Sequence, residues 1–428
     1  MSCYPGTTTL GSTSAWGCVA HFLFPGVQNN CKKAKIRKKK EKNKKTDLFS
    51  FEMLWSVFTL FPAAVLAEWQ IIAKDIGGGP LGVACYEDGL TCITSVSQIL
   101  PAGYEAKRST DGGVTWATVP DQDLFIFALY NQAVYGEYAV ISGSEFIQKS
   151  DNKGLNFSAV PGSLAIGGGS IVRKLFGSAG VPTGFAILGL TDDGNTNGLV
   201  VSQNNVAGPW TEINIGELKA GVIATDGAFL TDAWIVVGEE YTTGGSQHSK
   251  QRRESPTKAV YATQVVRSID KGKTWDTLYY NKSVATLGLA CVDALHCCLV
   301  QEDADYAYIQ CTMDGFKTVN TTLIDDTEGA SLVEASVDSN LCYVVIGGAV
   351  TGGGQSPISY HSCDKGISWS LDTLSGFPYN LLFTDVDCLQ SGCWATLWDN
   401  SGIDPNGKLF FPSPEVYSQL FALFIYKT

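Results

Sequence analysis

An eight-residue pattern that recurs along the chain constrains its fold more than any other feature. In the form STDGGVTW, at residues 109–116, a serine lies two residues before an aspartate, a glycine lies two residues after it, and a tryptophan follows three residues later. The closest copies consist of Ser109, Asp111, Gly113 and Trp116; Ser268, Asp270, Gly272 and Trp275; and Ser362, Asp364, Gly366 and Trp369. More divergent copies consist of Ser150, Asn152, Gly154 and Phe157; Ser202, Asn204, Gly208 and Trp210; and Thr312, Asp314 and Val319.

These residue types predict a tight turn between two strands. An aspartate or asparagine side chain accepts hydrogen bonds from backbone amides two residues further on, and glycine adopts the positive φ that the reversal requires. Serine supplies a second acceptor, and the aromatic residue that opens the next strand is expected to pack inward over the turn. The central residues of successive copies are 41 to 66 residues apart, a period typical of propeller blades. Such a turn stabilises a fold and performs no chemistry itself.

The octapeptides resemble the Asp-boxes, or BNR repeats, of sialidase-like β-propellers. The resemblance extends from Glu68 to Phe411 and implies an all-β propeller of four-stranded antiparallel blades. It implies no single function, because Asp-boxes occur in sialidases, xyloglucan-cleaving hydrolases, sortilin-type receptors and Ycf48/Hcf136-type photosystem assembly factors.

The spacing of the boxes predicts seven blades. If each box joins the third strand of a blade to the fourth, residues 68–72 resemble a fourth strand with no box before it. We expect this strand to complete the last blade, whose other strands are expected at 381–387, 393–398 and 408–411. Closure by a terminal strand would remove exposed sheet edges. Six blades remain an alternative, as do eight if residues 417–426 begin a further unit.

Two segments precede the predicted propeller. Residues 1–52 contain a basic, low-complexity run at 32–45 with no apolar face, which predicts a disordered extension.

Residues 53–67 are uncharged and end with Val65 and Ala67 in the small-residue positions of a signal-peptidase site. They are short for a membrane span. We therefore expect translation from Met53 and cleavage after Ala67, with residues 1–52 as a misassigned or optional extension. A nuclear signal in the basic run, and a signal anchor or buried apolar segment at 53–67, are the alternatives.

The cysteines also favour a secreted protein. Without Cys3, Cys18 and Cys31 of the leader, ten cysteines remain, an even number. The expected disulfides are Cys85 with Cys92, Cys291 with Cys297, Cys298 with Cys311, Cys342 with Cys363, and Cys388 with Cys393, although Cys297 and Cys298 can exchange roles. No CxxC pair or histidine cluster points to a metal site, so we expect neither metal nor cofactor.

Sequons at Asn156, Asn281 and Asn320 are candidate glycosylation sites. They and the disulfides favour the extracellular space. A plastid lumen is the alternative, because a basic leader followed by an apolar segment resembles bipartite targeting.

The charge is divided unevenly along the chain. Residues 1–67 hold ten Lys and Arg against three acidic residues, so 20 basic and 39 acidic side chains remain from residue 68 onward. The resulting net charge near −19 argues against a nucleic acid or an anionic membrane as ligand.

Loops between second and third strands would lie on the rim opposite the Asp-boxes, and there we expect a ligand. Candidate binding residues recur where these loops begin: Glu145, Asp192 with Asp193, Glu239, Glu240, Glu302, Asp303, Asp399, and Trp398 as a stacking surface. One interpretation is an acidic ring that binds sugar hydroxyls, a basic peptide or Ca²⁺. The other is solvated loop residues that confer solubility. The tail is residues 412–428, in which YSQLFALFIY at 417–426 is expected to pair as an outer strand or to form a short helix.

No catalytic residue is assigned. From residue 68 onward the arginines are Arg108, Arg173, Arg252, Arg253 and Arg267, and the first strand contains none, so the carboxylate clamp of a sialidase is not expected. We favour a secreted, non-catalytic binding or assembly module for a glycan or protein ligand, with no stable membrane span. An extracellular glycoside hydrolase, whose paired carboxylates would lie about 5–10 Å apart, and a Ycf48/Hcf136-like assembly factor are the alternatives.

Overall fold

The computed structural model divides the chain into two compact units, residues 1–64 and 65–428. It describes residues 68–74, 76, 79–99, 102–120, 129–143, 147–160, 166–177, 180–191, 197–219, 221–241, 261–303, 306–324, 331–337, 342–351, 354–374, 377, 381–389, 391–399 and 421–427. The expected extension at 1–52 and signal peptide at 53–67 lie outside this set.

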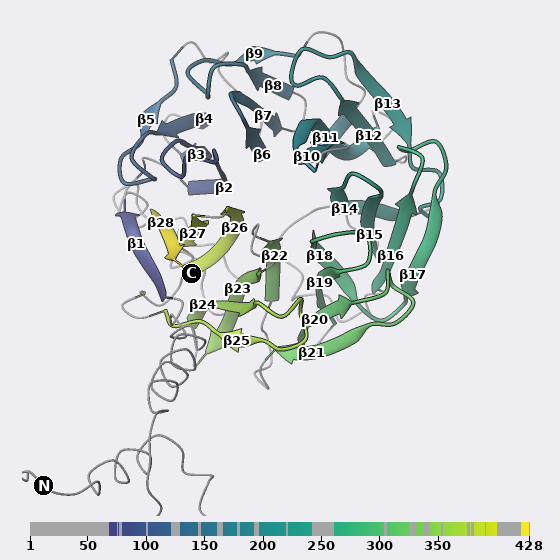
Figure 1. Ribbon diagram of the computed structural model, residues 1–428. Coiled ribbons are helices and arrows are strands. Elements are labelled where there is room, and N and C mark those ends of the chain that lie inside the picture. Colours follow the sequence, from purple (N-terminus) through teal and green to yellow (C-terminus); the bar gives the residue numbers. More distant parts are fainter. Residues whose placement is uncertain are drawn as a thin grey trace, which may run out of the picture. The chain divides into compact units, whose positions relative to one another are not determined.

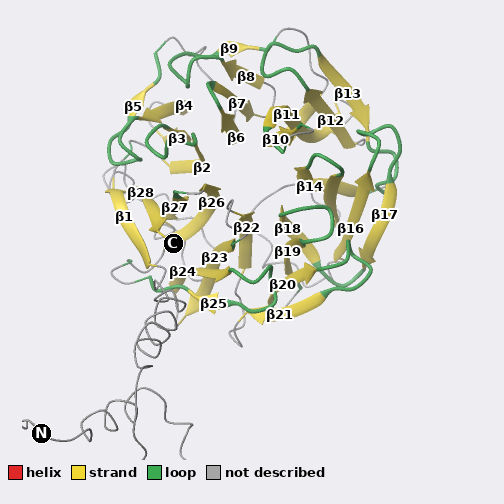
Figure 2. Ribbon diagram, viewed as in Figure 1, coloured by secondary structure: helices red, strands yellow, loops and turns green. Residues whose placement is uncertain are grey.

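Within the described residues every regular element is a β-strand, and all but one of the strand pairings are antiparallel (Figure 2). Three groups of four are β2 (Gly79–Cys85), β3 (Cys92–Ile99), β4 (Ala102–Ser109) and β5 (Ala117–Thr118); β6 (Leu129–Tyr135), β7 (Tyr138–Gly143), β8 (Ile147–Ser150) and β9 (Ser158–Ala159); and β10 (Ile166–Phe176), β11 (Pro182–Thr191), β12 (Asn197–Ser202) and β13 (Trp210–Asn214). Because these ranges contain no helix, none of them supplies a helical membrane span.

Three further groups are β14 (Val222–Phe229), β15 (Trp234–Tyr241), β16 (Tyr261–Ser268) and β17 (Asp276–Asn281); β18 (Ala285–Cys291), β19 (Cys297–Glu302), β20 (Ala307–Thr312) and β21 (Asn320–Ile324); and β22 (Ser331–Val337), β23 (Tyr343–Thr351), β24 (Gly354–Ser362) and β25 (Ser370–Leu371). The groups β10–β13 and β14–β17 join through one parallel bridge, between Leu175 and Phe229. A last sheet has the order β1 (Glu68–Lys74), β28 (Phe421–Lys427), β27 (Gly392–Asp399) and β26 (Leu381–Leu389).

The groups surround a common centre. The innermost strand is the first strand in each of the six groups of four, and β26 in the last sheet (Figure 1). The strands β2, β6, β10, β14, β18, β22 and β26 contact one another in this order, and β26 returns to β2. Each sheet therefore packs between two others.

Neighbouring residues of a second strand face different sheets. In β7, Ala139 and Ile141 pack with Ile93 of one neighbour, whereas Val140 between them packs with Phe185 of the other. Because both faces are covered, such a strand requires a continuous apolar run instead of alternation.

The N-terminal strand joins the last sheet. It pairs antiparallel with β28, from Glu68 opposite Lys427 to Lys74 opposite Ala422. The third position of this sheet, expected for residues 408–411, is held by β28, and 408–411 lie outside the described residues. The run FALFIY at 421–426 supplies more apolar strand-forming residues than KLFF, and it pairs with β27 along six positions.

The repeated turns share one hydrogen-bond pattern. The Ser109 hydroxyl donates to Asp111 Oδ1 at 2.8 Å and accepts from the Gly113 amide at 2.8 Å. Asp111 accepts from the Thr115 amide at 2.9 Å, so the carboxylate binds an amide four residues on, not two as predicted. The reason is that two successive residues have positive φ: Gly112 and Gly113 here, at 75° and 94°. This bends the chain back over the carboxylate.

The same geometry recurs at Asp270, Asp314 and Asp364. Hydrogen bonds from the amide and hydroxyl of Thr274 lower the pKa of Asp270 to about 2. The pKa values of Asp111, Asp314 and Asp364 are also lowered by such bonds. These carboxylates therefore favour the folded state above their unfolded pKa, and this contribution is lost as the pH falls through their folded values.

The turns also contact the preceding sheet. Arg108 Nε donates to the Lys153 carbonyl at 2.6 Å, and Lys149 Nζ donates to the Val206 carbonyl at 3.0 Å. Gly366 lies on the Cys298–Cys311 disulfide, where an added Cβ would be 2.5 Å from Cys311 Sγ. Each of these turns thus links two sheets as well as two strands.

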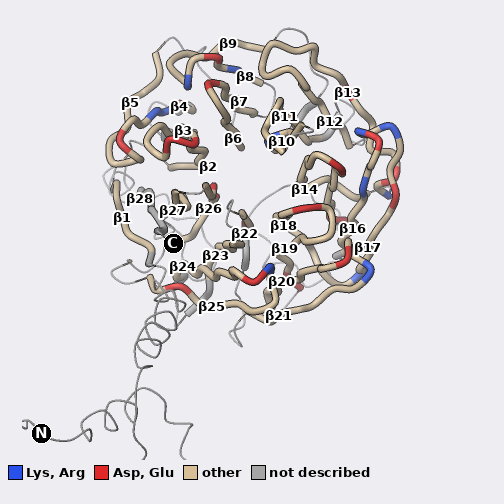
Figure 3. The backbone as a smooth tube through the Cα atoms, viewed as in Figure 1, with Lys and Arg blue, Asp and Glu red and all other residues tan. Residues whose placement is uncertain are grey.

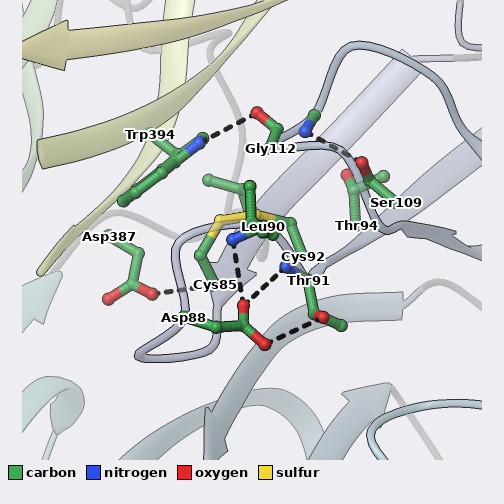
Figure 4. Close-up of a disulfide and its surroundings, with 12 residues drawn as sticks. Cys85, Asp88, Leu90, Thr91, Cys92, Thr94, Ser109, Gly112, Asp387 and Trp394 are labelled. Carbon is green, nitrogen blue, oxygen red and sulfur yellow. Dashed lines mark hydrogen bonds between the residues drawn. A yellow bond between two sulfur atoms is a disulfide. The ribbon is translucent and has the colours of Figure 1, made fainter. Parts of the chain in front are cut away.

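The structure contains five disulfides, with the pairing that the sequence predicts. Cys85–Cys92 joins the ends of β2 and β3, and Asp88 orders the turn between them by accepting from the amides of Leu90 and Thr91 (Figure 4). Trp394, from the last sheet, donates to the Gly112 carbonyl at 3.2 Å beside this turn (Figure 4).

Substitution of Gly366 by alanine tests the packing role of the turns. Gly366→Ala should destabilise the fold by about 2–4 kcal/mol, because strain at its φ of 84° adds to overpacking against the disulfide. Gly180→Ala is the matched control, since Gly180 has a φ of 71° with nothing within 4 Å of the added Cβ, and it should cost only about 1–2 kcal/mol. Denaturant titration measures both, and equal losses would contradict this role.

Candidate functional site

The structure places the described candidate residues at the ends of second strands. Glu239 and Glu240 lie in β15, and Glu302 ends β19 with Asp303 directly after it. The backbone of Trp398 and Asp399 ends β27. Glu145, Asp192 and Asp193 lie outside the described residues. The described positions therefore share the rim where second strands lead to third strands, as the sequence predicts, whereas a complete ring stays a prediction.

Tyrosines hold two of these carboxylates within their own sheets. Glu240 Oε2 accepts from the Tyr280 hydroxyl at 3.2 Å. Asp303 accepts from the Tyr308 hydroxyl at 2.7 Å and from the Tyr306 amide at 2.7 Å. The rim of these neighbouring sheets is therefore both acidic and aromatic.

A cation also lies at this rim. Lys219 Nζ lies 3.2 Å from the centroid of the Tyr280 ring, and the Lys219 amide donates to Gln264 at 2.9 Å. Burial, and secondarily the charge of Glu240, raise the pKa of Tyr280. Cationic groups are thus accommodated over this aromatic ring.

A second cluster, which sequence reasoning missed, lies among the innermost strands. Arg173 Nε on β10 donates to Asp226 Oδ1 on β14 at 2.7 Å, and Arg173 Nη2 forms an ion pair with the same oxygen at 2.7 Å. The same Nη2 is 3.2 Å from Glu334 Oε1 on β22, although β14 and β18 lie between β10 and β22 in the ring. Lys174 Nζ lies 3.6 Å from Asp387 Oδ1 on β26. These two side chains bridge strands that are not neighbours, across the centre of the ring.

A β-bulge places the acidic residues of this cluster. The register shifts by one residue just before Asp226, Glu334 and Asp385, and a bulge of this kind redirects the following side chain. Asp226 then accepts from the Leu289 amide of β18 at 2.7 Å, and Asp385 from the Val83 amide of β2 at 2.8 Å.

Smaller residues take the equivalent position in other first strands. Asn131 follows the bulge of β6 and accepts from the Val172 amide at 3.0 Å. Gly82 and Gly288 follow those of β2 and β18. In the sequence, this cluster could have been recognised from a polar residue or a glycine that recurs at one fixed position of first strands that are otherwise mainly apolar.

The cluster has strongly perturbed acidity. Burial raises the pKa of Glu334 despite the charge of Arg173. Burial also raises the pKa of Asp385 to about 7, supported by the charge of Asp387 and opposed by the Val83 amide and Arg173. The pKa of Arg173 is raised because Asp226 and Glu334 outweigh its own burial. Asp385 is thus a carboxyl group that holds a proton near neutral pH.

The opposite rim carries a shallow groove. It lies between the turns after β4 and β8, has a volume of about 230 Å³, and is lined by Arg108, Trp116 and Leu155 among others. Among the described residues, no group of three or more His, Cys, Asp or Glu is arranged to hold a metal ion.

The sequence matches no protein-family model and no curated protein. Solved structures resemble it in fold. Ycf48 bound to a D1 peptide has a TM-score of 0.51 at 12% identity, covering 84% of this chain and 97% of that one. An ancestral GH74 enzyme has a TM-score of 0.50 at 13% identity, covering 83% and 47%. The GH74 enzyme of Niastella koreensis has a TM-score of 0.42 at 11% identity, covering 76% and 64%.

The likenesses to Ycf48 and to the ancestral GH74 enzyme, at low identity, show a β-propeller fold. The chain spans about half the length of the ancestral GH74 enzyme, 47%, and nearly the whole of Ycf48, 97%. Because the identity is this low, the likenesses do not give the activity, substrate or partner of this chain. These are inferred below from its own residues.

Replacement of Arg173 tests whether the central cluster stabilises the ring. Arg173→Gln should cost about 3–5 kcal/mol, because it leaves Asp226, whose side chain is fully buried, without its cation. Lys153→Gln, which breaks the exposed pair with Asp88, is the control and should cost no more than about 1 kcal/mol. Denaturant titration at pH 7 distinguishes them, and a neutral Arg173→Gln would refute the stabilising role.

Proposed function

We propose that residues 68–427 form a secreted, seven-bladed propeller of the Asp-box type that binds a protein segment without catalysing a reaction. The closed order of contacts from β2 through β26 supports the blade number. Pairing of β1 with β28 supports closure of the ring by the N-terminal strand. In this proposal the propeller extends beyond residue 411 and includes β28 of the tail.

The observation that carries the binding proposal is the acidic and aromatic rim at the ends of β15 and β19. Glu239 and Glu240 lie on one sheet, and Glu302 and Asp303 on the next. Figure 3 marks the acidic and basic positions along the backbone, and the net charge from residue 68 onward is near −19. A basic, extended peptide is electrostatically complementary to such a rim. That Ycf48, of similar fold, is solved with a bound peptide supports a protein segment over a glycan.

One observation favours a glycoside hydrolase as the second candidate. The raised pKa of Asp385, about 7, is what a general acid needs at neutral pH. Two observations argue against a hydrolase. Asp385 is 6% exposed and Glu334 is paired with Arg173, so both carboxyl groups make their contacts inside the ring. We therefore place the hydrolase second.

The compartment is proposed from the disulfides and sequons. Five disulfides agree with an extracellular or lumenal location. Asn156 and Asn320 are exposed, whereas Asn281 is half-buried and donates to the Tyr279 hydroxyl at 3.0 Å. A Ycf48-like role in a plastid lumen would leave these sequons unused.

Peptide and glycan arrays test the ligand class. The secreted protein should bind basic peptides more tightly than acidic or neutral ones, and less tightly as salt increases. A variant with Glu239→Gln and Glu240→Gln should bind about tenfold more weakly, since roughly 1.4 kcal/mol of attraction is lost. A control with Glu137→Gln and Asp232→Gln removes two charges from exposed turns on the opposite rim and should retain affinity.

Two results would contradict this proposal. Selective glycan binding would replace the protein ligand. Turnover of oligosaccharides that is lost in Asp385→Asn would establish the hydrolase instead.

Expression of the whole chain in secretory cells tests processing. We expect N-terminal sequencing of the secreted protein to begin at Glu68, because cleavage after Ala67 leaves β1 intact. Enzymatic deglycosylation should shift its mobility, and Asn156→Gln and Asn320→Gln should each remove one glycan, whereas Asn281→Gln should not. A mature N-terminus before Met53, or plastid import of a fluorescent fusion, would exclude this pathway.

A further inference from the structure

The sheet in which the two ends of the ring meet is attached to β2 by two carboxylates. Asp385 Oδ2 accepts from the Val83 amide at 2.8 Å, and Asp387 Oδ2 accepts from the Cys85 amide at 2.9 Å (the latter in Figure 4). Both carboxylates belong to β26 and both amides to β2. The innermost strands on this side are therefore held together by acceptors that are themselves ionisable.

A third carboxylate attaches the same sheet to its other neighbour. Trp69 Nε1, from β1, donates to Ser359 Oγ at 3.0 Å and to Asp372 Oδ2 at 3.2 Å. The Ser359 hydroxyl binds the same carboxylate oxygen, and His361 Nδ1 lies against the other one, Oδ1. Asp372 is 5% exposed, so these donors replace its hydration. We call this group the Trp69 latch: Trp69, Ser359, His361 and Asp372.

We propose that proton uptake at these two attachments regulates closure of the ring, so that the last sheet and its strand β1 are held firmly in mildly acidic solution and open more readily as the pH rises. A protonated His361 gives Asp372 a cationic partner, whereas a neutral imidazole does not. A protonated Asp385 avoids a further negative charge in the buried cluster. The two effects act on opposite sides of one sheet.

The charged groups around each site determine the direction. Asp385 interacts with Arg173 of β10, Glu334 of β22 and Asp387 of its own strand, and Lys174 is occupied by Asp387. His361 Nδ1 lies against the Asp372 carboxylate, and the other two members of the latch, Trp69 and Ser359, are uncharged. Protonation therefore removes a charge that burial disfavours at the first site and adds attraction at the second.

Both sites bind a proton more tightly in the folded chain. Burial raises the pKa of Asp385 from 3.8 to about 7, and the hydrogen bond with Asp372 raises the pKa of His361 above 6.5. The stability that these two sites contribute is complete below their unfolded pKa values and is lost as the pH rises through the folded values.

The Asp-box aspartates act in the opposite sense, because their lowered pKa values favour folding above about pH 4. Ring closure is therefore firmest at roughly pH 4–6.

Hydrogen exchange of the full secreted protein at pH 5.5 and pH 8, corrected for the intrinsic rate, tests this inference. The opening equilibrium of β1 should rise with pH, by up to about tenfold per pH unit for each proton released. The amides of β18 and β19, in another sheet, serve as the internal reference. Equal corrected protection of β1 at both pH values in the wild type would overturn the proposal, whatever the behaviour of variants.

Substitutions test whether the pH dependence of β1 opening arises at Asp385 and His361. Asp385→Asn removes the ionisable group but keeps an acceptor for the Val83 amide, and His361→Gln keeps a hydrogen-bonding side chain without a titrating charge. Each should weaken the pH dependence of β1 opening, and the double variant should abolish it. His296→Gln, at a histidine that contacts Asp293 in the turn after β18, should leave it unchanged. An undiminished pH dependence in the double variant would refute the assignment.

Discussion

Hydrogen bonds that cross from one sheet to the backbone of the next are the interaction on which this ring depends. Apolar packing between sheets is not directional, so it does not by itself fix how two sheets align. The alignment comes from side chains that reach across: Arg108 to the Lys153 carbonyl near the outside, and Asp226 and Asp385 to the amides of Leu289 and Val83 near the centre. Each of these cross-sheet hydrogen bonds joins two groups at fixed positions along their strands, so a sheet that slipped along its neighbour would leave buried polar groups unpaired, at about 1–3 kcal/mol each.

The features that could be predicted from the sequence are those defined within one stretch of chain. Each repeated turn is encoded by eight consecutive residues, and a disulfide such as Cys85–Cys92 closes a loop of few residues, so local spacing was sufficient to predict both. Long-range relations were beyond reach. The link from Arg173 to Glu334 spans 161 residues, and it arises because a bulge just before Glu334 redirects that side chain, which Arg173 then contacts from a strand that is not a neighbour. The choice of β28 over residues 408–411 depends on register with β1 and β27, which no local pattern encodes.

The division of labour between the two rims explains why the repeats predict a fold more readily than a function. In the turn around Asp270, the carboxylate accepts from the Ser268 hydroxyl and from the amide and hydroxyl of Thr274, and Gly272 lies against Ile213 of the preceding sheet. Such positions tolerate little change. On the opposite rim the described acidic residues are held within single sheets, as Glu240 is by Tyr280. Binding specificity can vary there without disturbing the ring.

Burial of the central charged cluster costs desolvation free energy, which other interactions in the ring must offset. Burial of Arg173 with Asp226 and Glu334 removes three charges from water, and a buried ion pair is often no more stabilising than apolar packing of the same volume. Unlike apolar packing, this ion pair is directional. Arg173 of β10 contacts Glu334 of β22 only when the intervening strands, β14 and β18, are in place. A ring with one sheet missing or misplaced would leave Asp226 or Glu334 buried without a cation. The cluster therefore favours one closed arrangement over near alternatives, and the raised pKa of Glu334 is the electrostatic consequence of meeting that requirement in a dry interior.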